Sequence, residues 1–320
     1  MFVRATDSAT LVYSPEAPDS PGREKGMTFR AAVASAAAGL VLLALQAARA
    51  FAADTPERVT FLSADRKTTL VGYVYAPEGA HPAHVPAVVM MHGRAGAYST
   101  RANGVYDATT LSKRHQAWGR LWAEAGYLAV MVDGFGPRGY PQGFPRFSYG
   151  ERPEEVNEVT VRPLDAYGAL AYLRTRPDVS PERIGYIGRS NGGSAGLVTM
   201  SLDAPGIRQP NPRTGFAAAL IFYPACGLKG QFEEDGYVPY APVQVLHGTA
   251  DQETSSARCA AFVERSRKLG GEISITLYPG AAHGFDDPSR KRQRNRANAA
   301  ATEDAVDKAR DFFAQYLEER

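Results

Sequence analysis

Cysteine is scarce in this chain of 320 residues, which contains only Cys226 and Cys259. The histidines, six in number, do not group with these cysteines or with one another at the spacing of zinc ligands. A glycine-rich P-loop for binding nucleotide phosphates is also missing. The sequence therefore predicts a protein with no metal site and no cofactor.

An excess of charge of either sign is missing too. The 36 Lys and Arg residues are balanced by 34 Asp and Glu residues, which leaves a formal net charge of +2. Nucleic-acid-binding domains usually carry a marked basic excess, concentrated on one face. We therefore expect no nucleic-acid partner.

Long hydrophobic runs are absent except for one near the N-terminus. Residues 31–48 are uncharged, follow Arg30 and precede a stretch of small residues. This pattern predicts a secretory signal peptide within residues 1–52, with an upstream extension if Met27 is the true start. The alternative is a retained membrane anchor. We expect an exported protein, periplasmic or secreted, with no stable membrane partner after cleavage.

The two cysteines both lie in the part of the chain that would remain after cleavage. An even pair in an oxidising compartment predicts one disulfide, between Cys226 and Cys259. The alternative is two unrelated buried thiols, because free cysteine packs as a small hydrophobic residue.

Short β-branched runs alternate with helical patterns from about residue 56 onward. Strands are predicted at 58–62, 69–75, 87–91, 127–133, 184–188, 217–223, 243–247 and 273–278. Helices are predicted at 111–125, 163–174, directly after Ser190, at 255–268 and at 301–317. The first two strands have polar interruptions typical of antiparallel strands, whereas the later ones are nearly continuous, as in parallel strands buried on both faces.

This alternation predicts the α/β fold class, with a mostly parallel eight-stranded sheet flanked by helices. Residues 53–320 form a single predicted domain. The segment between the strands at 217–223 and 243–247 is too short for a large lid domain.

The segment Gly188-Arg189-Ser190-Asn191-Gly192 matches the pattern G-x-S-x-G between a predicted strand and a predicted helix. Such a turn holds the serine in a strained conformation, so the residues two before and two after it must be small. The N-terminus of the following helix favours developing negative charge. We therefore predict that Ser190 is a nucleophile. The alternative is a glycine-rich turn that happens to contain a serine.

A serine nucleophile needs a histidine base. His283 follows the last predicted strand in a loop of small residues, which leaves its ring free to reach the serine. His92 and His247 end strands and are expected to be structural, and His115 falls in a helical pattern and is expected to be solvated.

The base in turn needs an acid that orients it. Asp251 follows the strand at 243–247 and is preferred over Asp235 and Glu253. The order Ser190, Asp251, His283 along the chain is that of the α/β-hydrolases among serine-triad enzymes.

An oxyanion hole needs two backbone N–H donors. The first is predicted to be the N–H of Asn191, which follows the nucleophile. The second is predicted in the loop after the strand at 87–91, where Gly93 permits close approach and Arg94 supplies the N–H.

These segments together resemble the dienelactone hydrolase family of α/β-hydrolases, in particular its exported serine members. The likeness covers about residues 56–318 and is carried by HGRAG (92–96), VDGFGPRG (132–139), IGRSNGG (187–193), LHGTAD (246–251) and YPGAAHGFDD (278–287). The resemblance implies carboxylic-ester hydrolase activity, no cofactor, and Ser190, Asp251 and His283 as the triad. Dienelactone hydrolase itself has a cysteine nucleophile where this chain has Ser190, which argues against dienelactone as the substrate.

The expected function is hydrolysis of a small-molecule or polymer-borne ester through an acyl-enzyme. Two other classes stay open. One is a serine peptidase of the same fold, which would usually need a large additional gating domain. The other is a non-catalytic binding protein on a hydrolase scaffold, which would be expected to lack a triad member.

The substrate rim is predicted in the loop 134–152, which is rich in aromatic, Pro, Gly and Arg residues. Arg138 is expected to pair with a substrate carboxylate. The aromatic side chains expected to face a ligand are Phe135, Tyr140, Phe144 and Phe147. The alternative is an irregular loop that packs its own aromatic rings.

For two other cationic features the sequence leaves alternatives open. Arg189, beside the nucleophile, is expected to face either the cleft or solvent. The run at 290–296 contains five Lys or Arg residues and is predicted to be a solvated loop before the last helix, with anion binding as the alternative.

Overall fold

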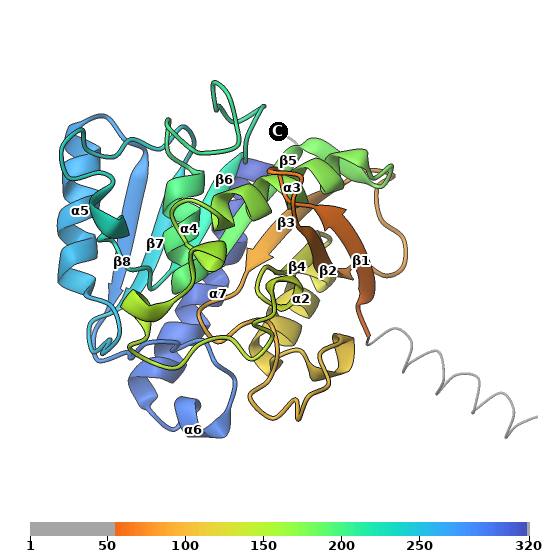
Figure 1. The fold of residues 1–320 in the computed structure, drawn as a ribbon, viewed down its shortest axis with the longest axis horizontal. Helices are drawn as coiled ribbons and strands as arrows, with labels where there is room; N and C mark the ends of the chain where they lie inside the picture. The colour runs from red at the N-terminus through yellow and green to blue at the C-terminus, as the bar shows by residue number, and fades with distance from the viewer. Residues whose placement is uncertain (1–54, 319–320) are drawn as a thin grey trace, which may run out of the picture. The chain divides into compact units, whose positions relative to one another are not determined.

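A computed structural model describes residues 55–318, so the predicted signal peptide at 1–52 lies outside the described residues. Eight strands form one sheet in the order β1-β2-β4-β3-β5-β6-β7-β8 (Figure 1). Their bounds are β1 (Glu57–Leu62), β2 (Thr69–Tyr75), β3 (Val85–Met91), β4 (Leu128–Asp133), β5 (Val179–Arg189), β6 (Ala218–Phe222), β7 (Val243–Gly248) and β8 (Ile273–Tyr278). The helices are α2 (Lys113–Glu124), α3 (Arg162–Thr175), α4 (Asn191–Thr199), α5 (Ser256–Lys268), α6 (Arg290–Gln293) and α7 (Arg296–Leu317).

The sheet is mixed at one edge and parallel elsewhere. β1 pairs antiparallel with β2, and β2 pairs antiparallel with β4. From β4 across to β8 every neighbouring pair is parallel. The prediction of antiparallel strands at the beginning and buried parallel strands afterwards is confirmed.

Helices cover both faces of this sheet, which produces two hydrophobic cores. The core that includes Leu170 of α3, Leu197 of α4 and Phe262 of α5 lies on one face. Trp122 of α2 and Phe313 of α7 belong to the core on the other face. Neighbouring residues of β3 alternate between the two cores, because successive side chains of a strand point to opposite faces. This is why the parallel strands are nearly continuous apolar runs.

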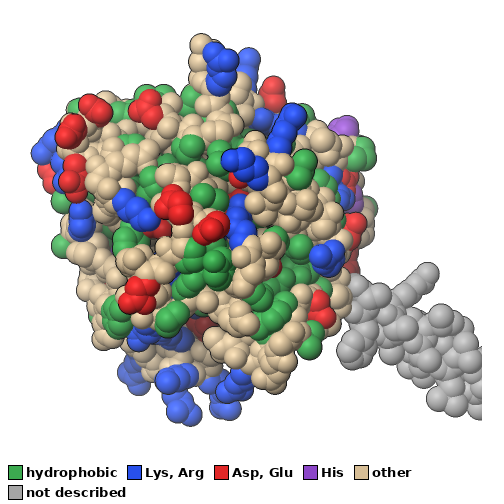
Figure 2. Space-filling view, viewed as in Figure 1, with side chains coloured by type: hydrophobic (Ala, Val, Ile, Leu, Met, Phe, Trp, Pro, Cys, Tyr) green, Lys and Arg blue, Asp and Glu red, His purple; other side chains and the backbone are tan. Residues whose placement is uncertain are grey.

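The main differences from the predicted elements lie near the C-terminus. The run at 290–296 is not simply a loop, because it contains the short helix α6, and α7 begins at Arg296 rather than at residue 301. Most of the Lys and Arg side chains of this run are exposed, and Figure 2 shows a cluster of basic side chains at the lower edge of the molecule, where Figure 1 places α6.

His115 is also placed differently from the prediction. It is buried on α2, and its Nδ1 atom lies 2.9 Å from the carbonyl oxygen of Ala97. Because the carbonyl group replaces the lost contact with water, the ring is held inside the fold rather than solvated.

The segment between β6 and β7 contains a single 3₁₀ turn, Leu228–Gly230, as its only helical element. This agrees with the expectation that no large lid domain is inserted there. Among residues 55–318, no helix is long and apolar enough to cross a membrane.

Candidate active site

Ser190 lies at the carboxyl end of β5, between that strand and α4. Its backbone has φ 53° and ψ −117°, a conformation that L-residues rarely adopt and that costs energy to hold. The Ser190 N–H donates to the carbonyl oxygen of Phe222 at 2.9 Å, which anchors the turn to β6. A side chain at Gly188 would collide with the carbonyl oxygen of Gly192, and one at Gly192 would come within 2.6 Å of the carbonyl oxygen of His92. The small residues that the motif requires are therefore needed sterically.

His283 and Asp251 lie next to this serine, although they are far from it in sequence. The Nε2 atom of His283 is 3.0 Å from Ser190 Oγ, and its Nδ1 atom is 2.8 Å from Asp251 Oδ2. The three side chains come from the ends of β5, β7 and β8. Because the carboxyl ends of parallel strands meet at one edge of a sheet, the topology brings them together.

The Asp251 carboxylate is held by its own loop. Its Oδ1 atom accepts the N–H groups of Glu253 and Thr254 at 2.7 and 2.9 Å, and Oδ2 accepts the Thr254 hydroxyl at 2.8 Å. Burial alone would raise the pKa of Asp251, but the hydrogen bond and charge of His283, followed by the two backbone N–H groups, outweigh burial and lower it. The carboxylate is thus kept ionised and aimed at the Nδ1 atom of His283.

Glu253, the rival acid, occupies a different place. Its carboxylate pairs with Arg94 at 2.8 Å and with Arg146 at 2.9 Å. It approaches His283 from the Nε2 side, at 3.9 Å, rather than from the Nδ1 side that Asp251 occupies. Glu253 is therefore not placed to orient the imidazole as Asp251 is.

The loop after β3 packs against Ser190. A Cβ atom at Gly93 would lie 3.1 Å from Ser190 Cβ, so only glycine fits without displacement. The His92 Nδ1 atom is 2.7 Å from the Gly93 carbonyl oxygen, and the Gly134 N–H donates to His92 Nε2 at 3.3 Å. Burial holds the pKa of His92 well below its usual value, so the ring is neutral, with the proton on Nδ1. In a trans peptide the N–H and C=O groups point in opposite directions, so fixing the Gly93 carbonyl also fixes the direction of the Arg94 N–H.

Asn191 is the first residue of α4, so its backbone N–H has no acceptor within the helix. Its side chain is buried, and both its oxygen and its nitrogen form hydrogen bonds. Asn191 Oδ1 accepts from Arg162 Nη1 at 2.6 Å, and Nδ2 donates to Glu158 Oε2 at 3.0 Å. Arg94 and Asn191, the two predicted oxyanion donors, both line the cavity that contains Ser190.

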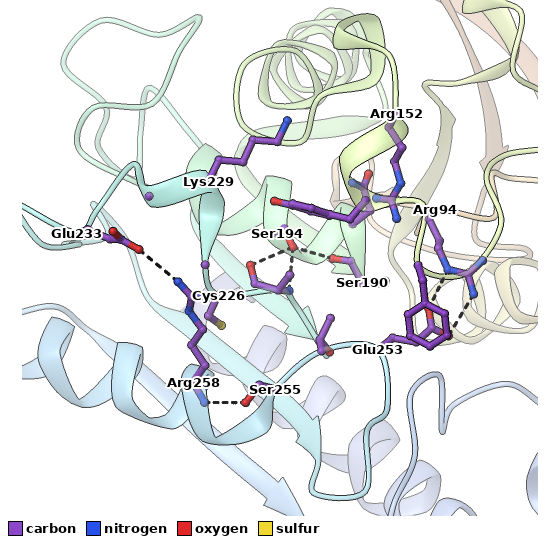
Figure 3. Close-up of a pocket in the computed structure, with 17 residues that line it drawn as sticks. Arg94, Arg152, Ser190, Ser194, Cys226, Lys229, Glu233, Glu253, Ser255 and Arg258 are labelled. Atoms are coloured by element: carbon purple, nitrogen blue, oxygen red, sulfur yellow. Dashed lines mark hydrogen bonds and ion pairs between the residues drawn. The ribbon is translucent and has the colours of Figure 1, made fainter.

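That cavity has a volume of about 680 Å³. Figure 3 shows Ser190 and Ser194 near its centre, with Arg94 and Glu253 to one side and Arg258 and Glu233 to the other. Four cationic and two anionic side chains line it: Arg94, Arg152, Lys229, Arg258, Glu233 and Glu253. Among residues 55–318, no group of three or more His, Cys, Asp or Glu side chains is arranged to hold a metal ion.

The predicted substrate rim is largely wrong. Phe135 is 0% exposed and packs edge-on against His92, with ring centroids 4.4 Å apart. Arg138 forms two hydrogen bonds of 2.8 Å with the buried carboxylate of Asp165, so it is not free to bind a substrate carboxylate. Tyr140 packs against Phe144, with ring centroids 5.3 Å apart, and neither lines the cavity. The loop mostly packs its own aromatic rings.

Phe147, which is 74% exposed, is the member of the predicted aromatic set that does line the cavity. Tyr149 and Arg152 from the same loop line it as well. Most of the opposite wall comes from residues 225–233, a segment in which the sequence predicts the disulfide partner Cys226 but no substrate-binding residue. Two features of this segment could have indicated a cavity wall. It has no regular strand or helix pattern, and it lies between β6 and β7 at the same sheet edge.

Cys226 lies in this wall, and the structure joins it to Cys259 of α5 in a disulfide. The predicted pairing is confirmed. The bridge links the loop after β6 to the helix after β7, so it fastens the cavity wall at Cys226 to α5.

The fold is shared with solved α/β-hydrolases of low sequence identity. Thermogutta terrifontis esterase 2, in a structure phosphorylated by paraoxon, is 20% identical, with a TM-score of 0.57 over 83% of this chain and 96% of that one. A propionate-bound structure of the same esterase is 19% identical, with a TM-score of 0.57 over 83% and 97% of the two chains. The dienelactone hydrolase-like promiscuous phosphotriesterase P91, from metagenomic libraries, is 19% identical, with a TM-score of 0.59 over 82% and 99% of the chains.

The model of the Dienelactone hydrolase family matches residues 70–317. This match covers the sheet from β2 onward and every segment that forms the cavity around Ser190. The protein belongs to the dienelactone hydrolase family of α/β-hydrolases.

Proposed function

We propose that this protein is a carboxylic-ester hydrolase that acts through Ser190. The observation that carries the proposal is the continuous line of contacts from Ser190 Oγ through His283 to Asp251, opening into a cavity. A nucleophile within hydrogen-bond reach of a base, which is itself oriented by a third group, is the arrangement that activates a serine hydroxyl.

The proposed mechanism is a two-step acyl transfer. His283 accepts the proton of the Ser190 hydroxyl as Oγ attacks the ester carbonyl carbon, and it then passes that proton to the departing alcohol. Water attacks the acyl-enzyme in the same way, so the acid is released and Ser190 regains its proton. Asp251 stabilises the imidazolium that forms in each step.

Negative charge develops on the carbonyl oxygen in both steps. The N–H groups of Arg94 and Asn191 are the proposed donors to that oxygen. Oriented donors of this kind contribute about 3–4 kcal/mol each to stabilising the transition state. The N-terminus of α4 adds its dipole in the same direction.

The substrate is proposed to be a small ester or one borne by a polymer. The Thermogutta esterase binds propionate and butyrate in its structures, and a cavity of about 680 Å³ leaves room for acids of that size and larger. Within residues 55–318, the segment between β6 and β7 contains only one 3₁₀ turn and no inserted helical lid, which argues against gating by a lipid surface. A serine peptidase and a non-catalytic binding protein are the competing proposals.

The test compares the protein spanning residues 53–320 with its Ser190→Ala variant. Short- and long-chain p-nitrophenyl esters and a peptide anilide serve as substrates. We expect hydrolysis of the esters, fastest for short acyl chains, and complete loss in Ser190→Ala. Ester hydrolysis that persists in this variant would refute the assignment. Cleavage of the anilide alone would favour a peptidase, and no turnover of any substrate would favour a binding protein.

We also propose that the protein is exported. The disulfide supports this, because such bonds persist mainly in oxidising compartments. N-terminal sequencing of the protein recovered outside the cytoplasm should find a mature chain that begins near residue 53. A chain that retains residues 31–48 in the membrane fraction would instead indicate an anchor.

A further inference from the structure

Arg162, the first residue of α3, is a fully buried arginine close to the candidate active site. Its Nη1 atom donates two short hydrogen bonds, one to the His92 carbonyl oxygen at 2.7 Å and one to Asn191 Oδ1 at 2.6 Å. The guanidinium lies over the ring of Phe135, with 4.8 Å between Arg162 Cζ and the ring centroid.

The two acceptors belong to the two halves of the proposed oxyanion hole. His92 directly precedes the Gly93-Arg94 peptide, whose N–H is one proposed donor. Asn191 carries the other. One guanidinium nitrogen therefore joins the loop after β3 to the start of α4, two segments that are about a hundred residues apart in sequence.

Glu158 completes the clamp on Asn191. It is almost fully buried, and its Oε2 atom accepts from Asn191 Nδ2 at 3.0 Å, so the side-chain amide of Asn191 is held from both ends. A side chain fixed in this way limits rotation of the first turn of α4. The direction of the Asn191 backbone N–H is thereby fixed as well.

This arrangement is not explained by stability alone. The Nε and Nη2 atoms of Arg162 are buried and have no hydrogen-bond acceptor among residues 55–318. Burial is the first cause that lowers the pKa of Arg162, which means that holding its charge there is unfavourable. A buried donor without a partner calls for an explanation, and a functional role is one of the few available.

We propose that Arg162 is a positioning residue that aligns the two oxyanion donors, Arg94 N–H and Asn191 N–H, on a common point beside Ser190. This inference rests on the proposed function. It predicts that loss of Arg162 weakens binding of the transition state and leaves binding of the ground-state ester almost unchanged.

The test uses Arg162→Met, Arg162→Lys and Asn191→Ala. For each variant, kcat and KM are measured with p-nitrophenyl butyrate, together with the inhibition constant of an alkyl trifluoromethyl ketone, whose adduct with a serine carries an oxyanion. We expect Arg162→Met to lower kcat/KM by about 10²-fold, since small misplacements of catalytic groups cost this much. KM should change little, and the inhibition constant should rise by a similar factor.

The other two variants separate alignment from folding. Arg162→Lys keeps a cationic donor and should recover part of the lost activity. Asn191→Ala retains its backbone N–H but loses the side chain that Arg162 holds, so it should be impaired in the same way. Combining Asn191→Ala with Arg162→Met should cost much less than the product of the two single effects. If Arg162→Met does not fold, Arg162→Lys and Asn191→Ala carry the test.

Arg174→Met is the matched control. Arg174 lies on the same helix and donates to the carbonyl oxygens of residues 213–215, away from the cavity. This variant should unfold at a lower temperature while kcat, KM and the inhibition constant stay unchanged.

The inference is overturned if folded Arg162→Met or Asn191→Ala keeps kcat/KM and the inhibition constant within about twofold of the parent protein. It is also overturned if kcat falls while the inhibition constant does not rise. The proposed function fails in a different way, when the parent protein itself neither hydrolyses the ester nor binds the trifluoromethyl ketone.

Discussion

Arg189 and Asp286 form a buried ion pair, with 2.7 Å between Arg189 Nε and Asp286 Oδ2 and side chains that are 1% and 0% exposed. Arg189 directly precedes Ser190, and Asp286 follows His283 by three residues. The pair therefore ties the turn that carries the serine to the loop that carries the histidine. Arg189 faces neither the cleft nor solvent, because its guanidinium also lies over the Trp118 ring, 4.6 Å from the centroid.

Removing one partner of this pair should be strongly destabilising. Asp286→Asn leaves the Arg189 charge buried without its carboxylate, which typically costs about 3–5 kcal/mol. Urea unfolding should show this loss of free energy. Glu264→Gln, which breaks the exposed pair with Lys268, should leave the unfolding midpoint unchanged. An Asp286→Asn variant as stable as the parent protein would contradict this role.

The same carboxylate predicts how stability depends on pH. Burial alone would raise the pKa of Asp286, but the charges of Arg114 and Arg189 outweigh it and lower the pKa from 3.8 to about 2. A lowered pKa in the folded state gives stability that is present above about pH 4 and is lost as pH falls toward 2. The contribution is about 2–3 kcal/mol. Unfolding free energies measured from pH 5 to pH 2 should fall less steeply in Asp286→Asn than in the parent protein.

The disulfide should stabilise the fold by constraining the unfolded chain. Its cysteines are 33 residues apart in sequence, and a loop of that length corresponds to about 4 kcal/mol in the chain-entropy model. We expect the double variant Cys226→Ser, Cys259→Ser to have an unfolding free energy lower by about that amount, so that it unfolds at a lower urea concentration. Titration of thiols in the unfolded, unreduced protein should find none. Two reactive thiols would show that the bridge is not formed in the protein.

The excess of cationic side chains around the cavity should favour anionic esters. Lys229 is exposed and lines the cavity from the segment 225–233, and Arg152 lines it from the loop 134–152. Lys229→Glu should raise KM for the mono-p-nitrophenyl ester of glutarate several-fold and leave KM for the neutral butyrate ester unchanged. The difference should shrink at high salt, because exposed charges are screened. Equal changes with both esters would show that charge does not select the substrate.

Much of the fold and the candidate catalytic residues could be predicted because their signals are local. Each parallel strand is a continuous apolar run, and Ser190 lies in a five-residue pattern whose glycines have a steric reason. Asp251 and His283 follow from strand order, because parallel strands present their carboxyl ends at one edge. The signal peptide and the catalytic roles of these residues stay predictions.

The prediction of the substrate rim is largely wrong because its side chains contact residues that are distant in sequence. The sequence around Arg138 does not indicate its ion-pair partner, because Asp165 lies 27 residues away on α3. Phe135 follows β4 and packs edge-on against His92 of another loop. A loop rich in aromatic and arginine residues does not reveal which of them it buries. The position of Arg162 between two distant loops is likewise invisible without the fold.

The most direct test of the central claim is to find which side chain reacts as the nucleophile. The folded protein is treated briefly with paraoxon, and the phosphorylated residue is located by peptide mass spectrometry in the parent protein and in Ser190→Ala. We expect a single adduct on Ser190, with no adduct in the variant. An adduct on Ser194, which lines the same cavity, or equal labelling of Ser190→Ala, would contradict it.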